Sequence, residues 1–446
     1  MTLSMEGVLA LAPDESSIKA ARGLQAPGGW PLLGASPRAL WGECKGSGAK
    51  PYQTQVDLSG PAFRCSCPSR KFPCKHGLAL LMLHVQQAAL FQANSEPPAW
   101  VSEWLDARAE KAQKQESRAA SSAPAAPSNP EAAAQRETQR WERITLAGQD
   151  LQRWLADQLN QGLGALNAQG LKTWQSMAAR LVDAQAPGLA QRLREAAAGV
   201  HQGADWPERT LARLGLLQLA CEALARRQDL APATQAELRQ LLGWPLERVD
   251  VLAGGERVDD AWSVLASFSE EREDRLTERR VWLHGESTGR RALLLDHAFA
   301  GRGFEQAWLV GSRQRAVLAF YPGSAGLRAL CTDSPVQDGA ARWPATELAQ
   351  EWQALAERVA ASPWQALQPM VLSKAVLLRA GTQWQIACEG QVLPASIPDT
   401  QAWQLLALQG GAALGLMGEW DGRTLRPLSV WSPAEPAPLW LLGAAS

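Results

Sequence analysis

The sequence predicts a multidomain α+β protein, with a small ββα module near its N-terminus, a central helical region and a strand-rich C-terminal domain. Three observations predict this. A Cys/His cluster follows two short extended segments within the first 90 residues. Apolar residues recur at helical spacing between residues 136 and 243, and short apolar runs divided by turn residues dominate from about residue 250. The length of 446 residues agrees, because it exceeds what one ordinary hydrophobic core accommodates.

The composition is that of a soluble globular protein, with 46% hydrophobic and 20% charged residues. A formal net charge of −1 argues against electrostatic steering of the whole molecule to nucleic acid, but leaves room for a local basic patch. No apolar run reaches the roughly 18–20 residues that cross a bilayer, and no secretory signal is visible at the start. Seven cysteines, an odd number, favour reduced thiols and a cytoplasmic location.

The N-terminal region, residues 1–105, is expected to have its core at residues 35–90. Strands are expected over residues 39–44 and 53–58, because Val56 and Leu58 alternate with polar residues. A helix is expected to follow from about Pro73 to Phe91, since proline suits the first helical position and apolar residues recur at helical spacing after it. Further helices are expected at residues 13–19, with Asp14 as the N-cap, and at residues 100–115.

The remaining domains are separated by a change of composition. Residues 106–135 include an Ala/Pro/Ser-rich stretch that cannot bury enough apolar area to order itself, which predicts a linker. Residues 136–245 predict a helical domain, in which Trp174, Met177 and Leu181 share one helix face. Residues 250–446 predict a mixed, strand-rich domain, without an internal repeat of fixed period.

Four residues within twelve positions carry the clearest chemical signal: Cys65, Cys67, Cys74 and His76. Three thiolates and one imidazole complete a tetrahedral shell for Zn²⁺ and leave no position for water, which is typical of a structural metal site. A helix starting near Cys74 favours the thiolate form through its dipole. The alternative is a redox pair, Cys65 and Cys67, with Cys74 as a buried thiol. Cys44 is either an ordinary strand cysteine or a fifth thiol near the site.

The spacing Cys-x-Cys-x(6)-Cys-x-His, preceded by two strands and followed by an apolar helix, resembles the SWIM zinc finger. Residues 41–52 and 65–78 resemble its bacterial members. The resemblance implies zinc ligands at Cys65, Cys67, Cys74 and His76 in a ββα module that binds DNA or other proteins. It also implies partners of the AAA+ ATPase or von Willebrand A type. It covers only about residues 35–90, so it assigns no residue role in the rest of the chain.

Basic residues surround the cluster. Residues 1–90 contain nine Lys/Arg and five Asp/Glu, a formal excess of +4. The candidates to contact nucleic acid or a partner are Lys45, Lys50, Arg70, Lys71 and Lys75. Tyr52 and Phe72 lie nearby in the sequence and offer rings for base stacking. The alternative is a solvated rim that balances the charge of the thiolates and binds nothing.

Little in the sequence favours an enzyme. No phosphate-binding loop is present, and a closed metal shell cannot activate water. A hydrolytic group from Ser287, His284 and the Asp296–His297 pair is conceivable, but isolated histidines at strand ends are more often packed or solvated. Two functions remain as hypotheses. The first is a zinc-stabilised scaffold or adaptor that binds proteins, and the second is DNA binding through the basic rim of the finger. No catalytic residue and no membrane partner are expected.

Overall fold

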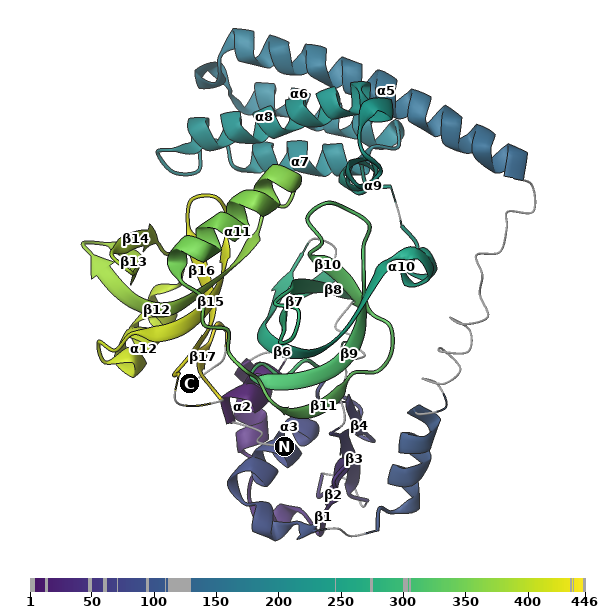
Figure 1. Cartoon of the computed structure of the whole chain (residues 1–446). Helices are drawn as coiled ribbons and strands as arrows, with labels where there is room; N and C mark the ends of the chain where they lie inside the picture. Colours follow the sequence, from purple (N-terminus) through teal and green to yellow (C-terminus); the bar gives the residue numbers. More distant parts are fainter. Residues whose placement is uncertain are drawn as a thin grey trace.

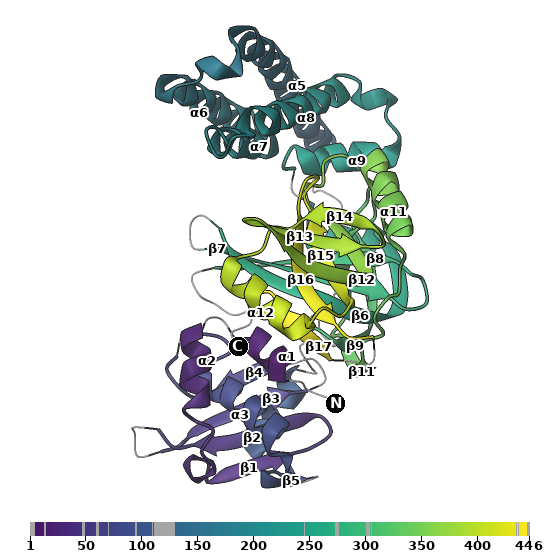
Figure 2. The ribbon, with the colours of Figure 1, turned by 90° about the vertical axis from the view of Figure 1, so that its left-hand side faces the viewer.

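The computed structural model describes residues 5–12, 15–46, 50–58, 62–69, 71–93, 96–108, 110, 130–244, 246–272, 276–299, 304, 306–433, 435 and 437–443. The parts are stacked in a column. A helical bundle lies at one end, two β-barrels lie in the middle, and an N-terminal lobe lies at the other end (Figures 1 and 2). Among the described residues, no helix is both long and apolar enough to span a membrane.

The N-terminal lobe is built on a five-stranded sheet in the order β4-β3-β2-β1-β5. Its strands are β1 (Leu32–Ala35), β2 (Ala39–Cys44), β3 (Tyr52–Asp57), β4 (Ala62–Cys65) and β5 (Gln92–Ala93). Its helices are α1 (Met5–Ala10), α2 (Glu15–Arg22), α3 (Lys75–Gln86), the short η1 (Pro27–Gly29) and η2 (Ala88–Leu90), and a helix over residues 99–108. The ββα unit expected from the sequence is β2, β3 and α3, embedded in this larger sheet.

Both faces of the sheet are covered because neighbouring strand residues point to opposite sides. On one face, Leu40 and Val56 pack with the buried side of α3. On the other face, Trp41 packs with Val101 and Trp104 of the 99–108 helix. Gly34 on β1 lies against the Trp41 indole, where an added Cβ would approach the ring to 2.4 Å, so this position needs a glycine.

Both expected boundaries of the helix after the cluster differ from the structure. Helix α3 begins at Lys75 instead of Pro73, with Cys74 extended at its N-cap, and it ends at Gln86 because Gln87 leaves the helical conformation. Of the expected helix over residues 100–115, the structure describes residues up to 108 and residue 110, so its expected end lies outside the described residues. The expected N-cap Asp14 also lies outside them.

The central region is a bundle of helices with one shared core, which contains the predicted stripe of Trp174, Met177 and Leu181. Its elements are α5 (Pro130–Gln161), η3 (Leu163–Ala165), α6 (Ala168–Asp183), α7 (Pro187–Ala198), α8 (Trp206–Ala225), η4 (Arg227–Asp229) and α9 (Pro232–Leu241). Helix α5 begins at Pro130, within the expected linker of residues 106–135. The reason is local, because proline is preorganised for the first helical turn and the alanines at 132–134 have the highest helix propensity. Residues 111–129 lie outside the described part.

The C-terminal region contains two barrels joined by α11 (Leu348–Ala361) and preceded by α10 (Arg248–Gly254). The first barrel, residues 256–340, comprises β6 (Glu256–Glu271), β7 (Leu276–Gly285), β8 (Arg291–Phe299), β9 (Ser312–Phe320), β10 (Arg328–Cys331) and β11 (Val336–Ala340). The second barrel, residues 368–441, comprises β12 (Gln368–Ala380), β13 (Gln383–Cys388), β14 (Gln391–Pro394), α12 (Asp399–Gln409), β15 (Leu414–Trp420), β16 (Leu425–Trp431) and β17 (Pro438–Leu441).

The two barrels share one strand order. In each, strands 1, 2 and 3 form an antiparallel meander, strand 4 pairs antiparallel with strand 1, and strand 5 pairs antiparallel with strand 4. Strand 5 also runs parallel to strand 3, through β10–β8 in the first barrel and a bridge between Ala395 and Leu425 in the second. Strand 1 carries a bulge in both. This is the order of the five-stranded OB-fold barrel, and the repeat is not evident in the sequence.

The barrels pack through the outer face of β7 and β8. Trp282 and Leu293 of the first barrel pack against Met417, Leu428 and Trp431 of the second. The same interface holds a buried ion pair between Arg280 and Glu419, with 2.8 Å between Nε and Oε1. Strand β17 in turn packs against α1, so the N-terminal lobe lies beside the second barrel.

Candidate metal centre

The four expected ligands come from adjoining parts of the N-terminal lobe. Cys65 is the last residue of β4, and Cys67 lies in the turn that follows. Cys74 is the N-cap residue of α3, and His76 lies in the first turn of that helix. The chain between Cys67 and Cys74 folds back, so the two pairs of side chains face each other.

The distances between these side chains match a tetrahedral shell. The Sγ of Cys65 lies 3.7 Å from Nδ1 of His76, and the Sγ of Cys74 lies 4.0 Å from the same nitrogen. One ligand atom from each of the four residues lies within 4.8 Å of all the others. Bonds of about 2.3 Å to sulfur and about 2.0–2.1 Å to nitrogen give tetrahedral edges of about 3.5–3.8 Å. A small contraction therefore suffices to bind one ion.

The thiols of the cluster influence each other's protonation. The hydrogen bond between Cys74 and Cys65 lowers the pKa of the Cys65 thiol to about 4, and the same bond raises the pKa of Cys74. Burial raises the pKa of Cys67. One thiolate thus suppresses ionisation of its neighbours. A divalent cation would remove that repulsion and displace the remaining protons, which makes metal affinity dependent on pH.

Neighbouring side chains hold the ligands in place. Thr54 of β3 lies opposite Cys65 of β4, and its Oγ1 is 3.1 Å from the Cys65 Sγ. The Tyr52 ring lies 4.9 Å from the His76 ring, centroid to centroid. Gly77 lies under Phe63, where an added Cβ would come within 2.9 Å of the ring. The sequence analysis did not identify Thr54, because only the register of β3 against β4 places it beside the sulfur.

The family comparisons agree with this geometry. Residues 52–84 match the SWIM zinc finger family, and residues 139–242 match the SWIM-associated four-helix bundle domain. The chain carries a SWIM zinc finger. The second match covers most of α5 and all of α6 to α9, so the bundle is the domain associated with that finger. Comparisons with curated proteins and with solved structures gave no match.

The SWIM finger match begins at the first residue of β3 and ends within α3, so it contains all four cysteine and histidine ligands. Together, the match and the geometry indicate a metal ion site. Strands β1, β2 and β5 lie outside the match and extend the sheet of the finger.

Cys44 is close to the cluster of Cys65, Cys67, Cys74 and His76 but does not belong to it. It is buried in the core that includes Leu40 and Val56, and it lies opposite Tyr52 in the β2–β3 ladder. Burial raises the pKa of its thiol to about 11, and the charge on Cys65 adds to this shift. A neutral core thiol is therefore the role that the structure supports for Cys44.

The five basic candidates are placed unevenly. Lys45 is exposed, and its Nζ donates to the Gly28 carbonyl at 3.3 Å. Lys71 is exposed, and its Nζ lies 2.7 Å from the Ser16 hydroxyl. Lys50 and Lys75 are exposed. Their side chains form neither a hydrogen bond nor an ion pair with any residue that the structure describes. Arg70 lies outside the described residues.

The structure gives each of the residues considered for hydrolysis contacts within the first barrel. The Asp260 carboxylate accepts hydrogen bonds from the backbone N–H groups of Ser287 and Thr288, and so shapes the β7–β8 turn. His284 is largely buried, and burial lowers the pKa of its imidazole to about 4. His297 is 3.6 Å from Glu278 on the neighbouring strand. Ser287 donates its backbone N–H to the Asp260 carboxylate, and no imidazole of the described residues forms a hydrogen bond with it. These contacts give the residues structural roles in the barrel.

Proposed function

We propose that the protein is a non-enzymatic adaptor, in which the SWIM finger holds Zn²⁺ as a structural ion and the four-helix bundle docks a partner protein. The assignment of zinc is supported by the donor set, since three thiolates and one imidazole at tetrahedral spacing suit Zn²⁺. All four positions of such a shell are taken by protein atoms. The ion would then stabilise the lobe and carry no reaction.

One observation carries the adaptor role, namely the exposed apolar face of α8. Leu211, Leu216 and Leu219 are 51%, 37% and 40% exposed on this helix. Its opposite side, with Leu214, Leu217 and Leu224, is buried in the bundle core. Several large apolar side chains exposed on the outer side of a helix mark a candidate contact surface. The bundle thus presents a surface whose composition fits contact with another protein.

The shape of this face fits a helix. Leu211, Gly215 and Leu219 are spaced four residues apart and therefore lie in one row along the helix. A Cβ added at Gly215 would have no neighbouring atom within 4 Å, so the surface above this glycine is open. A glycine between two leucines lets another helix approach closely and lets its apolar side chains pack between them. We therefore expect an apolar helix of the partner to bind here. AAA+ ATPases and von Willebrand A-type proteins are the partner classes to test first, because the SWIM resemblance implies them.

Isothermal titration of the intact protein with purified candidates of these two classes tests the proposal. The wild-type protein is expected to bind, and the Leu211→Glu/Leu219→Glu variant is expected to lose at least about 30-fold in affinity, since about 1–3 kcal/mol is lost for each buried apolar anchor that becomes charged. Leu408→Glu, on the distant helix α12, is the matched control because Leu408 is 56% exposed. Equal binding by the wild type and a correctly folded double variant would contradict the adaptor role of α8.

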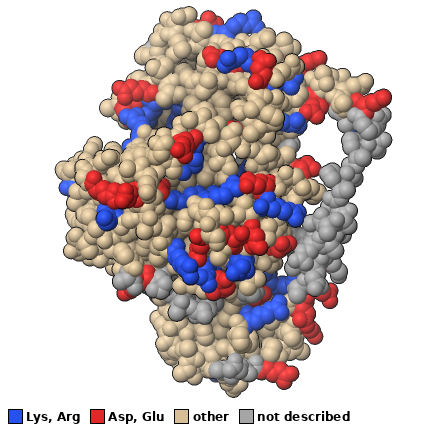
Figure 3. Space-filling model, viewed as in Figure 1, with Lys and Arg blue, Asp and Glu red and all other residues tan. Residues whose placement is uncertain are grey.

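Nucleic-acid binding by the SWIM finger is a second candidate function. A difference between the basic residues of the first barrel and those of the finger supports it. In the first barrel, several arginines are paired with carboxylates, as for Arg290 with Glu256, Arg291 with Glu351 and Arg313 with Asp338. Figure 3 shows this mixture of basic and acidic residues across the middle of the molecule. In the finger, Lys50, Arg64 and Lys75 have no carboxylate partner among the described residues. Unpaired cations are available to phosphates.

The same titration format separates the two functions. Binding of a DNA duplex or single strand that falls steeply between low and physiological salt, and that weakens in Lys71→Ala and Arg70→Ala, supports the second candidate. Protein binding that survives these two substitutions but is lost in Leu211→Glu/Leu219→Glu supports the first.

A further inference from the structure

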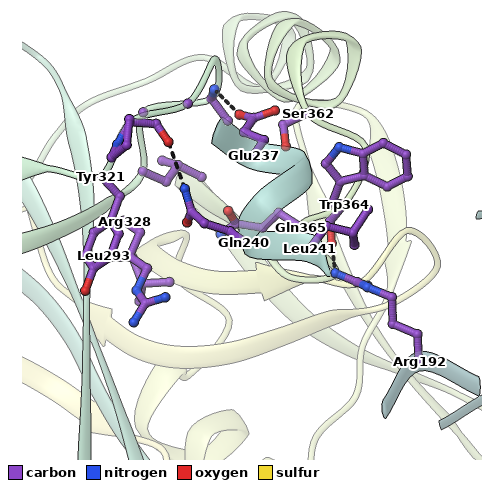
Figure 4. A pocket seen from close by; sticks show the side chains of 15 residues that line it. Arg192, Glu237, Gln240, Leu241, Leu293, Tyr321, Arg328, Ser362, Trp364 and Gln365 are labelled. Carbon is purple, nitrogen blue, oxygen red and sulfur yellow. Dashed lines mark hydrogen bonds between the residues drawn. The ribbon is translucent and has the colours of Figure 1, made fainter. Parts of the chain in front are cut away.

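A cavity lies where the helical bundle and the two barrels meet. It has a volume of about 240 Å³, and Figure 4 shows the side chains around it. One wall comes from Arg192 on α7 and from Glu237 and Gln240 on α9, and another from the loop after β9. The third wall comes from residues 362–365, between α11 and the second barrel. Sites between domains are a common location for small-molecule ligands.

The first barrel lines this cavity with the loop that OB-fold barrels use for ligands. Residues 321–327 connect β9 and β10, the fourth and fifth strands, and six of these seven residues face the cavity together with Leu293 of the third strand. In OB-folds, the face of strands 2 and 3 and the loops after strands 1 and 4 form the binding region. In the first barrel the second barrel covers most of that strand face, and the cavity is the part that stays open.

The corresponding loop of the second barrel is built differently. Its loop between strands 4 and 5, residues 421–424, is a tight turn closed by the Asp421 carboxylate. Arg423 in this turn forms an ion pair with Asp205 of the bundle, at 2.7 Å. The cavity is thus specific to the first barrel.

The basic residues of the cavity lack the carboxylate partners seen elsewhere in the barrels. The guanidinium of Arg328 stacks on the Tyr321 ring at 4.2 Å, and it makes no hydrogen bond or ion pair with a described residue. Its Nε is buried without a partner. Arg192 donates one hydrogen bond to the Trp364 carbonyl at 3.0 Å, and burial lowers the pKa of its guanidinium. Buried cationic donors of this kind are stabilised by an oxyanion.

Glu237 adds an acceptor to the same cavity. One of its oxygens, Oε1, accepts from the backbone N–H groups of Ser324 and Ala325, at 2.6 and 3.1 Å. The other, Oε2, is buried without a partner, on a residue that is only 9% exposed. Buried polar atoms in folded proteins are nearly always satisfied, and an unsatisfied one points to a missing partner. A hydrogen-bond donor on a ligand would satisfy it.

We propose that this cavity binds a small molecule that carries an oxyanion, a carboxylate or a phosphate, together with a hydrogen-bond donor. The oxyanion pairs with the guanidinium group of Arg328, with Arg192 on the opposite wall as a second cation, and the donor binds Oε2 of Glu237. The aromatic rings of Tyr321 and Trp364 and the side chain of Leu293 enclose the apolar part. Such a ligand contacts the bundle, the first barrel and the segment leading to the second barrel, so its binding also couples these three parts.

Calorimetric titration of the full-length protein with L-glutamate and with inorganic phosphate, at constant ionic strength, tests the proposal. Both probes carry an oxyanion, and only glutamate adds an ammonium donor for Glu237. Saturable binding of at least one probe is expected. Arg328→Gln is expected to weaken that binding at least tenfold, whereas Arg315→Gln on the same barrel leaves it unchanged, since Arg315 is an exposed residue paired with Asp338.

A second pair of variants checks the geometry. Glu237→Gln is expected to weaken the binding of glutamate more than the binding of phosphate. Arg328→Lys is expected to retain less than half of the wild-type affinity, because lysine keeps the charge but lacks the planar guanidinium group. Circular dichroism verifies that each variant folds. The proposal is overturned if neither probe binds saturably to the wild-type protein, or if Arg328→Gln and Arg192→Gln bind as tightly as Arg315→Gln.

Discussion

Among single residues, His284 gives the protein a dependence on pH that does not involve the metal. The imidazole lies in β7 of the first barrel, and its Nδ1 is buried without a hydrogen-bond partner. Burial and, to a smaller extent, the positive charge of Arg291 lower its pKa from 6.5 to about 4, while Asp260 acts in the opposite sense. The folded barrel therefore holds a neutral histidine at neutral pH.

The sign of the effect follows from linkage. Between pH 6.5 and about 4, the unfolded chain binds a proton at His284 and the folded chain does not, so stability falls as the pH is lowered through this window. The full shift corresponds to at most about 3 kcal/mol. Urea unfolding of the barrels at pH 7 and pH 5 is expected to show a smaller loss for His284→Gln than for the wild type. His201→Gln, at an exposed position in the bundle, is the control, and an equal loss in all three proteins would contradict the prediction.

Sequence and structure agree best at the residue level where chemistry and spacing coincide. Cys65, Cys67, Cys74 and His76 lie within twelve positions, so their chemistry could be inferred without any tertiary contact. Thr54 could not be found in this way, because its role depends on which strand residue lies opposite Cys65. The cavity residues Arg192, Glu237 and Arg328 come from three elements far apart in the chain, and no local pattern connects them.

At the level of elements, helices were easier to infer than barrels. The stripe of Trp174, Met177 and Leu181 is a local signal of period 3.6, and the structure buries all three residues in the bundle. The short apolar runs after residue 250 indicate strands, but they do not show which strands pair. The pairing of β6 with β9, for example, joins residues that are 50 or more positions apart in the chain. The shared order of the two barrels was invisible for this reason.

The packing of one barrel on the other depends on a buried charge cluster. Glu419 of β15 is 1% exposed, and it accepts hydrogen bonds from Arg280 Nε at 2.8 Å and Trp282 Nε1 at 2.9 Å. Burial lowers the pKa of Arg280, but the carboxylates of Glu419, Glu278 and Glu270 together outweigh this and raise it. Arg280 and Glu419 are 139 positions apart, so they fix two separately formed barrels against each other.

Removal of the carboxylate should be costly because the guanidinium stays buried. Glu419→Gln is expected to lower the free energy of unfolding of the barrels by about 1.5–3 kcal/mol, because Arg280 loses its buried partner but keeps its ion pairs with Glu278 and Glu270. Replacement of both partners, in Arg280→Met/Glu419→Leu, is expected to recover more than half of this loss, because no unpaired charge is left in the interface. Urea denaturation followed by circular dichroism of the β-strand signal measures both changes. A double variant less stable than Glu419→Gln would contradict this account.

For the whole molecule, the arrangement of hydrophobic cores predicts how it responds to metal removal. The core of the N-terminal lobe, with Leu40, Val56 and Leu80, shares no residue with the core of the bundle. The lobe meets the rest of the molecule through α1 against β17 and through Ala307, which packs on the edge of its core. Stabilisation by the ion therefore acts mainly within the lobe.

Chelation is expected to lower the melting temperature of the N-terminal lobe and to leave the transition of the bundle unchanged. The ion joins β4 to the start of α3, and without it the Cys67 and Cys74 thiols are protonated and the two elements lose their common anchor. Differential scanning calorimetry with and without chelator measures this, with elemental analysis to verify that the metal has been removed. Cys74→Ser should reproduce the effect in the absence of chelator. Cys44→Ser should keep stoichiometric metal and still respond to chelator, because Cys44 is a core thiol outside the cluster. An unchanged lobe transition after complete removal of the metal would show that the ion does not hold the lobe together.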